Sequence, residues 1–161
     1  MPSPDPVASN TTPLIKLVGV GLLDLLPTLY QKIHVPEAVF AEYQAGRAQH
    51  PGSPDLATLT WLIVHPVAPD PVIPANLDSG EAEAIALART LSARLILLDE
   101  RRGRAVAERL GLPVVGTMTV LIEAKRQGHV PLVAPIIDQM VAQGRRINPQ
   151  LRAEVLLQAG E

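Results

Sequence analysis

The run LILL at residues 95–98 is apolar at every position and is followed directly by Asp99 and Glu100. A strand with one solvated face would alternate apolar and polar residues, because successive side chains point to opposite faces of a sheet. A continuous apolar run instead indicates a strand in the centre of a parallel sheet, with helices covering both of its faces. This run therefore predicts an α/β fold with three layers, α/β/α, around a central, mainly parallel sheet.

The rest of the chain alternates short apolar runs with segments of helical character, which is the pattern of parallel strands joined by crossover helices. Strands are expected at 6–9, 33–35, 61–64, 95–98 and 113–116. Helices are expected at 13–29, interrupted at 19–21 and at Pro27 to give two short helices, and at 36–49, 80–93, 101–110, 117–127, 131–143 and 149–158. The proline-rich connector that precedes the helix at 80–93 is expected to contain no helix of its own.

Length and composition indicate one globular domain. The chain has 161 residues, of which 47% are hydrophobic and 19% are charged, and this is enough for a sizeable core. We expect the domain to span 6–145, with a helical extension at 146–161 and a loose tail at 1–5. The first residues lack the basic segment and apolar run of a secretion signal, and no apolar stretch approaches the roughly 18 residues of a membrane span. A cytoplasmic protein without membrane segments is therefore expected.

Composition also disfavours several classes of function. Aromatic residues make up only 2% of the chain, which disfavours the single-strand binders that stack bases on aromatic side chains. The net charge of −2 gives no general attraction to nucleic acid, although an enzyme can still meet phosphate through metal ions. The chain has no cysteine, and its four histidines form no i, i+4 pair, so a zinc site is not expected.

Four polar residues fall where the cleft of a parallel sheet would gather them. Asn10 follows the first strand, Glu42 lies in the helix expected at 36–49, Glu81 opens the helix at 80–93, and Asp99 directly follows the run LILL. Ligands of such sheets bind beyond the carboxyl ends of the strands. Carboxylates brought together there repel one another, and an oxygen-seeking divalent cation relieves that repulsion. The pattern favours a Mg²⁺ or Mn²⁺ site that acts on a phosphodiester.

Each of these positions has a structural alternative. Glu81 comes three residues after Asp78 in the sequence DSGE, so it could complete a capping box and satisfy backbone N–H groups. Glu42 could be an ordinary solvated helix residue. Asp99 could cap the helix that follows it. Thr117 could likewise cap a helix or add a hydroxyl group to the cleft.

Neighbouring charged residues are further candidates. Glu83 lies two residues after Glu81, about 200° around a helix, so these two side chains cannot share one face. Glu100 is expected to point away from Asp99 and is a reserve candidate. The segment DERRGR carries three arginines that could contact phosphates near Asp99 or form a solvated helix face; they are Arg101, Arg102 and Arg104.

Five stretches, in this order, resemble the PIN-domain ribonucleases, and within them the bacterial VapC-like toxins: VASNTTPLI, HVPEAVFAEY, LDSGEAEAIALA, LILLDERRGR and VVGTMTVL. The resemblance covers about residues 6–145. It implies a parallel sheet between helices, with acids that converge on Mg²⁺ or Mn²⁺ and cut single-stranded or structured RNA. It also implies a homodimer and a small antitoxin protein as a partner.

The resemblance assigns catalytic and metal-binding roles to four residues. The first-strand acid of the family falls on Asn10, the acid of the next helix on Glu42, the acid of the alanine-rich helix on Glu81, and the strand-end acid on Asp99. The departure is Asn10, because the family normally carries Asp at this position. An amide oxygen can coordinate a hard cation, but it supplies no negative charge and cannot act as a base.

Two functions follow from this comparison. The first is a metal-dependent ribonuclease, as the toxin of a toxin–antitoxin pair, in which the hydroxyl of Thr11 or Thr12 orients the attacking water. The second is a PIN-like scaffold that binds RNA or a partner protein without cutting, which the amide at position 10 and the scarcity of aromatic residues favour. Glu83, Glu100 and Thr117 are candidates for additional or supporting contacts.

Overall fold

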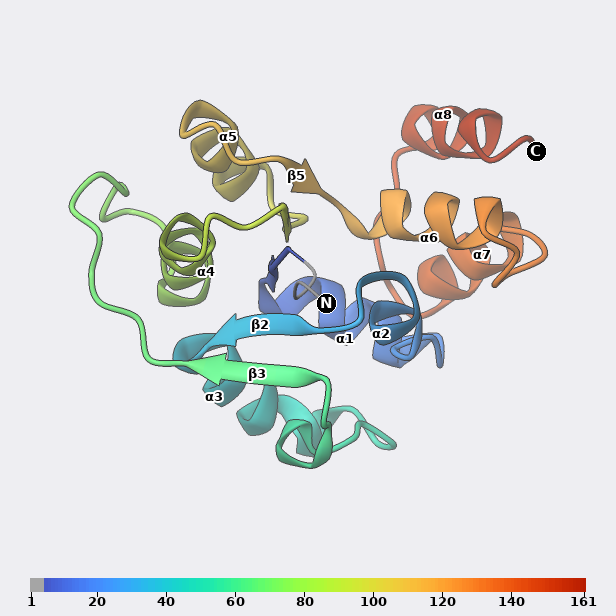
Figure 1. The fold of residues 1–161 in the computed structure, drawn as a ribbon. Coiled ribbons are helices and arrows are strands. Elements are labelled where there is room, and N and C mark those ends of the chain that lie inside the picture. Colours follow the sequence, from blue (N-terminus) through green and yellow to red (C-terminus); the bar gives the residue numbers. More distant parts are fainter. Residues whose placement is uncertain (1–4) are drawn as a thin grey trace.

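A five-stranded, all-parallel sheet forms the centre of the computed structural model, which describes residues 5–161 (Figure 1). The strand order is β3-β2-β1-β4-β5. The strands are β1 (Val7–Ser9), β2 (Ile33–Pro36), β3 (Leu62–His65), β4 (Leu95–Leu97) and β5 (Val114–Val115). This sheet confirms the predicted α/β/α fold class. The expected N-terminal tail falls almost entirely on residues 1–4, outside the described residues.

Eight α-helices flank the sheet within residues 5–161. They are α1 (Thr11–Gly19), α2 (Leu25–Tyr30), α3 (Glu37–Gly46), α4 (Ser79–Thr90), α5 (Arg101–Arg109), α6 (Thr117–Arg126), α7 (Ala134–Ala142) and α8 (Pro149–Gln158), with short 3-10 turns at Arg47–Gln49 and Leu56–Thr58. In this part of the chain no helix has both the length and the apolar character that crossing a bilayer requires.

The predicted interruption at Pro27 is wrong, whereas the one at 19–21 is found. Pro27 is the third residue of α2. In the first turn of a helix the backbone N–H groups have no intrahelical partner, so a proline there costs no hydrogen bond. The helical segment is therefore interrupted only after α1, and α2 continues past Pro27 to Tyr30.

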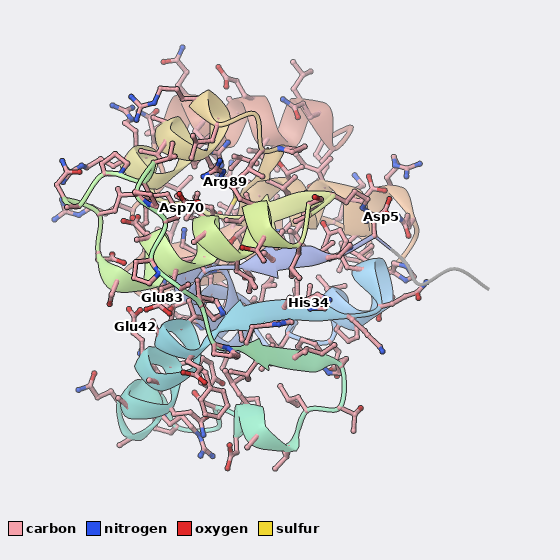
Figure 2. The ribbon with its side chains drawn as sticks, turned by 60° about the vertical axis from the view of Figure 1, so that its left-hand side comes forward. Asp5, His34, Glu42, Asp70, Glu83 and Arg89 are labelled. Carbon is pink, nitrogen blue, oxygen red and sulfur yellow. The ribbon has the colours of Figure 1, made fainter. Side chains whose placement is uncertain are left out.

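The helices form layers on the two faces of the sheet. α1 packs against α3, whereas α4 contacts β1, β2 and β4 and also packs against α5. Figure 2 shows α4 crossing in front of the sheet. Right-handed crossovers account for this division, because the chain moves from β1 outward to β3 and then returns through α4 to β4 on the other side of β1.

The central strands carry the core. Val7, Ala8, Ile96 and Leu97 are almost completely buried, because β1 and β4 have strands on both sides and helices on both faces. Burying one such aliphatic side chain contributes roughly 1.5–3 kcal/mol. The rigid centre of the molecule is thus the pair β1 and β4, and the residues that follow these two strands are held by it.

Two histidines far apart in sequence meet across β2 and β3. The Nδ1 atom of His34 (labelled in Figure 2) lies 2.8 Å from Nε2 of His65. Burial lowers the pKa of His34, and the charges of His65 and Lys32 lower it further. A search of the sequence for histidines at i, i+4 spacing does not detect this pair, because the two residues belong to different strands. The parallel pairing of β2 and β3 brings them together.

Candidate active site

The predicted polar residues gather where the strand order reverses. β1 is followed by Asn10 and β4 by Asp99, and these two strands are neighbours in the sheet. The Asn10 N–H donates a hydrogen bond to the Leu97 carbonyl at 3.0 Å, which extends the β1–β4 ladder to the edge of the site. Consecutive connections leave β1 and β4 toward opposite faces at this point, and such a switch point forms the usual binding crevice of a parallel α/β sheet.

Asn10 is a buried amide whose oxygen has no partner. It occupies the N-cap position of α1, but its side chain makes no capping hydrogen bond. The residue is only 4% exposed, and its Oδ1 atom accepts no hydrogen bond within the described residues. Buried polar atoms are usually paired, so an orphaned acceptor beside a cleft indicates a place for a donor or a cation.

Glu42 and Asn10 approach each other around Gly80. A Cβ built on Gly80 would lie 2.9 Å from Glu42 Oε2 and 3.4 Å from Asn10 Oδ1, so the start of α4 fits here because this residue lacks a side chain. The Thr11 hydroxyl donates to Glu42 Oε2 at 2.9 Å. Glu42 therefore turns its carboxylate toward Asn10 and Gly80, although the residue as a whole remains exposed to solvent. Figure 2 shows it at the end of β2 where the strand points.

Glu81 is a buried carboxyl group on the first turn of α4. Asp78 caps this helix by accepting from the Glu81 N–H at 2.8 Å, so the predicted N-terminal capping signal is present. Only 6% of Glu81 is exposed, and its Oε1 faces Gly103 of α5. Burial raises the pKa of Glu81, and the carboxylates of Asp78 and Glu100 raise it further. An acid that is costly to ionise in this way is a common feature of functional sites.

Asp99 is held in a fixed orientation from two sides. The backbone N–H of Thr117 donates to Oδ1 at 2.7 Å, and the Thr117 hydroxyl donates to Oδ2 at 2.6 Å. The Nζ atom of Lys16, on α1, lies 3.3 Å from the same Oδ2. Thr117 is the first residue of α6, so the positive end of that helix also points at the carboxylate. Thr117 thus acts on Asp99 and does not cap α6.

The remaining candidates are divided between the cleft and its surroundings. Glu100 accepts from the Thr12 hydroxyl at 2.9 Å, on the exposed side of the cleft. Glu83 instead lines a separate cavity between α4 and the connector that precedes it, away from Glu81. Arg101 and Arg104 line a cavity together with Asp99, whereas Arg102 does not.

The acids surround the cleft without forming a compact cluster. Among residues 5–161, no three histidine or acidic side chains lie close enough together to hold a metal ion in the present arrangement. Asn10 and Glu42 lie next to Gly80, whereas Asp99 is bound by Thr117 and Lys16. All the available donors are hard oxygen atoms, which Mg²⁺ and Mn²⁺ prefer.

Comparison with known families agrees with this geometry. A family model described as a PIN domain matches residues 6–161. The chain belongs to the PIN-domain family. PIN domains are generally nucleases, and the sheet, the switch-point crevice and the acids at its rim fit that class. No curated protein matches this PIN domain significantly.

Sequence reasoning missed two residues of the site. Lys16 is the one cation in an otherwise apolar stretch of α1, and that isolation was the available signal. Asp78 was considered only as part of a capping box, yet its Oδ1 would lie 3.5 Å from a Cβ on Gly80, beside Asn10 and Glu42. The cleft of this PIN domain therefore contains a lysine and a further carboxylate beyond the four predicted positions.

Proposed function

We propose that this PIN domain is a Mg²⁺- or Mn²⁺-dependent ribonuclease that hydrolyses RNA phosphodiester bonds. The observation that carries the proposal is the Asn10 amide oxygen, which is buried, unpartnered and close to the Glu42 carboxylate. A cation satisfies a buried acceptor and a neighbouring carboxylate together, whereas a neutral hydrogen-bond donor leaves the carboxylate charge uncompensated. The amide thus fits as a neutral ligand at the position where the family normally has an acid.

Four residues would hold the ion, and their side chains would have to move closer together to do so, because no three acids of the described residues are near enough as they lie: Asn10, Glu42, Glu81 and Asp99. When bound, Mg²⁺ or Mn²⁺ supplies a water of lowered pKa and neutralises charge on the phosphodiester. The chain's own contribution is orientation. Thr11 fixes the Glu42 carboxylate, and Thr117 fixes both oxygens of Asp99. Because Glu81 has a raised pKa, it favours a nearby cation that lets it ionise.

Lys16 supports the same chemistry from the side of Asp99. Its ammonium group lies at the edge of the cleft, where a phosphodiester would need positive charge. Arg101 and Arg104 border the same region and could bind the neighbouring phosphates of an RNA strand. The basic groups at this edge would attract RNA locally, although the whole chain has a net charge of −2.

A second candidate is a scaffold that binds RNA or a partner protein without cutting. The pairing of Lys16 with Asp99 favours it, because the lysine partly neutralises one of only a few carboxylates in the cleft. The amide at position 10 removes another charge. Both features weaken attraction for a divalent ion, so this alternative predicts binding without metal-dependent cleavage.

The biological setting we propose is a cytoplasmic toxin–antitoxin pair, in which a small antitoxin protein inhibits the toxin and two copies of this chain form a homodimer. Apolar side chains remain on the surface of the C-terminal half, and such surfaces support assembly; they include Leu132 and Val141. Light scattering would test the homodimer. A mass near 17.2 kDa at high concentration would contradict it for the free protein.

RNA cleavage by the purified chain tests the enzymatic proposal. Single-stranded RNA is incubated with the wild type in Mn²⁺, in Mg²⁺ and in chelator, beside the variant Asp99→Asn. The proposal expects cleavage only with metal and none by Asp99→Asn. Equal cleavage by the variant, or cleavage in chelator, would point to a contaminating nuclease or to another site.

A further inference from the structure

A cavity of about 580 Å³ opens beside Asp99 and extends away from the acids. One wall comes from α5, another from the start of α6, and the third from α8 with the residues before it. α8 packs against α6, and Figure 1 shows the two helices side by side. The segment from 146 onward, which the sequence treats as an extension of the domain, thus forms a wall of a cavity that begins at the active-site cleft.

The cavity is lined by three arginines without ion-pair partners. Arg101 and Arg104 reach it from α5, and Arg146 reaches it from the segment before α8. None of these three forms an ion pair within residues 5–161, and they share this property with some arginines outside the cavity, such as Arg94 and Arg109. What distinguishes them is that three guanidinium groups from two separate segments line one cavity. Glu108 and Glu154 also line the cavity, and neither pairs with these arginines. Arg104 donates only one long hydrogen bond, to the Leu98 carbonyl at 3.4 Å. Guanidinium groups that line one cavity without carboxylate partners indicate an anionic ligand, and guanidinium binds phosphate in a two-point fashion.

The cavity also has an apolar side. Met118, Ile147 and Leu151 line it, and Leu151 is 45% exposed, whereas Val155 of the same helix is buried in the core. A ligand that suits both the arginines and these side chains carries an anionic group and an apolar group. A nucleotide has both.

A second, smaller cavity of about 320 Å³ continues the surface on the other side of Lys16. It shares Lys16, Met118, Arg146 and Ile147 with the first cavity and reaches Thr12 and Glu100 at the mouth of the cleft. The two cavities therefore meet along Lys16 and Arg146, and Asp99 lines the larger one. An RNA chain in the larger cavity would lie beside the Asp99 carboxylate and could continue past Lys16 into the smaller cavity.

We propose that the larger cavity binds one nucleotide of a single-stranded RNA, adjacent to the phosphate that lies at Asp99. Its phosphate contacts Arg104 and Arg146, and its base packs on Ile147 and Leu151. The RNA identity of the ligand rests on the proposed function, whereas the site itself rests on the unpaired arginines and the apolar wall. The segment that contains α8 then positions the RNA relative to Asp99. Arg146, which lies outside the predicted DERRGR cluster, takes part in binding.

Binding of a labelled, short single-stranded RNA to the metal-free protein tests this inference. Fluorescence anisotropy in chelator measures affinity without cleavage, for the wild type, Arg146→Gln and Leu151→Ala. Matched controls are Arg109→Gln, at the far end of α5, and Leu157→Ala, on α8; neither residue lines the two cavities. Thermal melts confirm that every variant is folded.

We expect Arg146→Gln to bind roughly tenfold more weakly, because a charge-assisted hydrogen bond to phosphate is lost. The slope of log binding constant against log salt concentration should also decrease in magnitude by about one. Leu151→Ala should bind several-fold more weakly with an unchanged salt dependence. Both controls should match the wild type.

Two results would overturn the inference: no binding of single-stranded RNA by the wild type, or equal binding by Arg146→Gln, Leu151→Ala and their controls. The second result would leave the cavity to a protein partner. Failure of the proposed function is distinguishable. A wild type that binds through Arg146 but never cleaves contradicts the nuclease alone, whereas cleavage that ignores Arg146 contradicts only the nucleotide cavity.

Discussion

Thr117 donates both its backbone N–H and its hydroxyl group to the two carboxylate oxygens of Asp99. One residue thereby fixes the rotation and the position of an acid that follows the central strand β4. Supporting contacts of this kind orient the groups that hold a metal ion, and their loss is usually felt in activity more than in stability.

Replacing Thr117 by valine should therefore weaken catalysis while the fold remains. The variant keeps the N–H bond to Asp99 Oδ1 and loses the hydroxyl bond to Oδ2. We expect metal-dependent RNA cleavage to fall about 10- to 100-fold, with a stability loss of about 1 kcal/mol. The control is Thr28→Val, because the Thr28 hydroxyl bonds only to the Asp24 carbonyl at the start of α2. Equal activity in the two variants would remove Thr117 from the site.

A methyl group at Gly80 should disturb Glu42 and Asn10 directly. The added Cβ would lie 2.9 Å from Glu42 Oε2, which is too close, so the Glu42 side chain must move. We expect Gly80→Ala to lower Mn²⁺ affinity in calorimetry while its melting temperature changes little, since alanine favours the helix by about 1 kcal/mol. Gly46→Ala is the control, because nothing lies within 4 Å of its added Cβ at the end of α3. Unaltered Mn²⁺ binding by Gly80→Ala would show that Glu42 and Asn10 are not ligands.

Removal of the Lys16 charge should strengthen metal binding. The ammonium group 3.3 Å from Asp99 Oδ2 competes with a divalent ion for that oxygen. An ion pair of this partly exposed kind is worth about 1 kcal/mol, so Lys16→Met should bind Mn²⁺ about fivefold more tightly. Lys32→Met, outside the cleft, should bind as the wild type does. Weaker binding by Lys16→Met would mean that the lysine holds Asp99 in its binding orientation.

The raised pKa of Glu81 predicts a specific pH dependence of stability. Its ordinary value is 4.5, so between this pH and the higher pKa of the folded state the folded protein binds more protons than the unfolded chain. The stabilisation is full below 4.5 and is lost as pH rises through the folded pKa. In chelator, Glu81→Gln should gain melting temperature relative to the wild type at pH 7, and gain less at pH 4.5. An equal difference at both pH values would show that burial does not oppose ionisation of Glu81.

The sequence was informative about the fold because its signals are local. The run LILL before Asp99 predicted a central parallel strand, and β4 lies between β1 and β5. The sequence also predicted that the proline-rich connector contains no helix and that the alanine-rich segment after it forms one, which is α4. The prediction at Pro27 was wrong because the sequence does not reveal where a short helix begins. A proline disrupts the interior of a helix, but it is tolerated in the first turn, where Pro27 lies.

The site could be predicted only in part, because several of its contacts join residues that are far apart in the sequence. The positions of Asn10 and Asp99 follow from the strands that precede them, so they could be placed at one edge of the sheet. Lys16 reaches Asp99 from a different helix, and Arg146 approaches the same region from a segment more than 40 residues downstream in sequence. Such contacts depend on how helices pack, which no spacing within a segment reveals.

The most direct test compares RNA cleavage by the wild type and by Asn10→Asp, each in Mn²⁺ and in chelator. Our account predicts that the wild type cleaves when metal is present, with Asn10 as a neutral ligand. It also predicts that Asn10→Asp cleaves with a lower Mn²⁺ requirement, because the new carboxylate adds charge to the same position. An inert wild type beside an active Asn10→Asp would contradict the account and show that this PIN domain binds where its relatives cut.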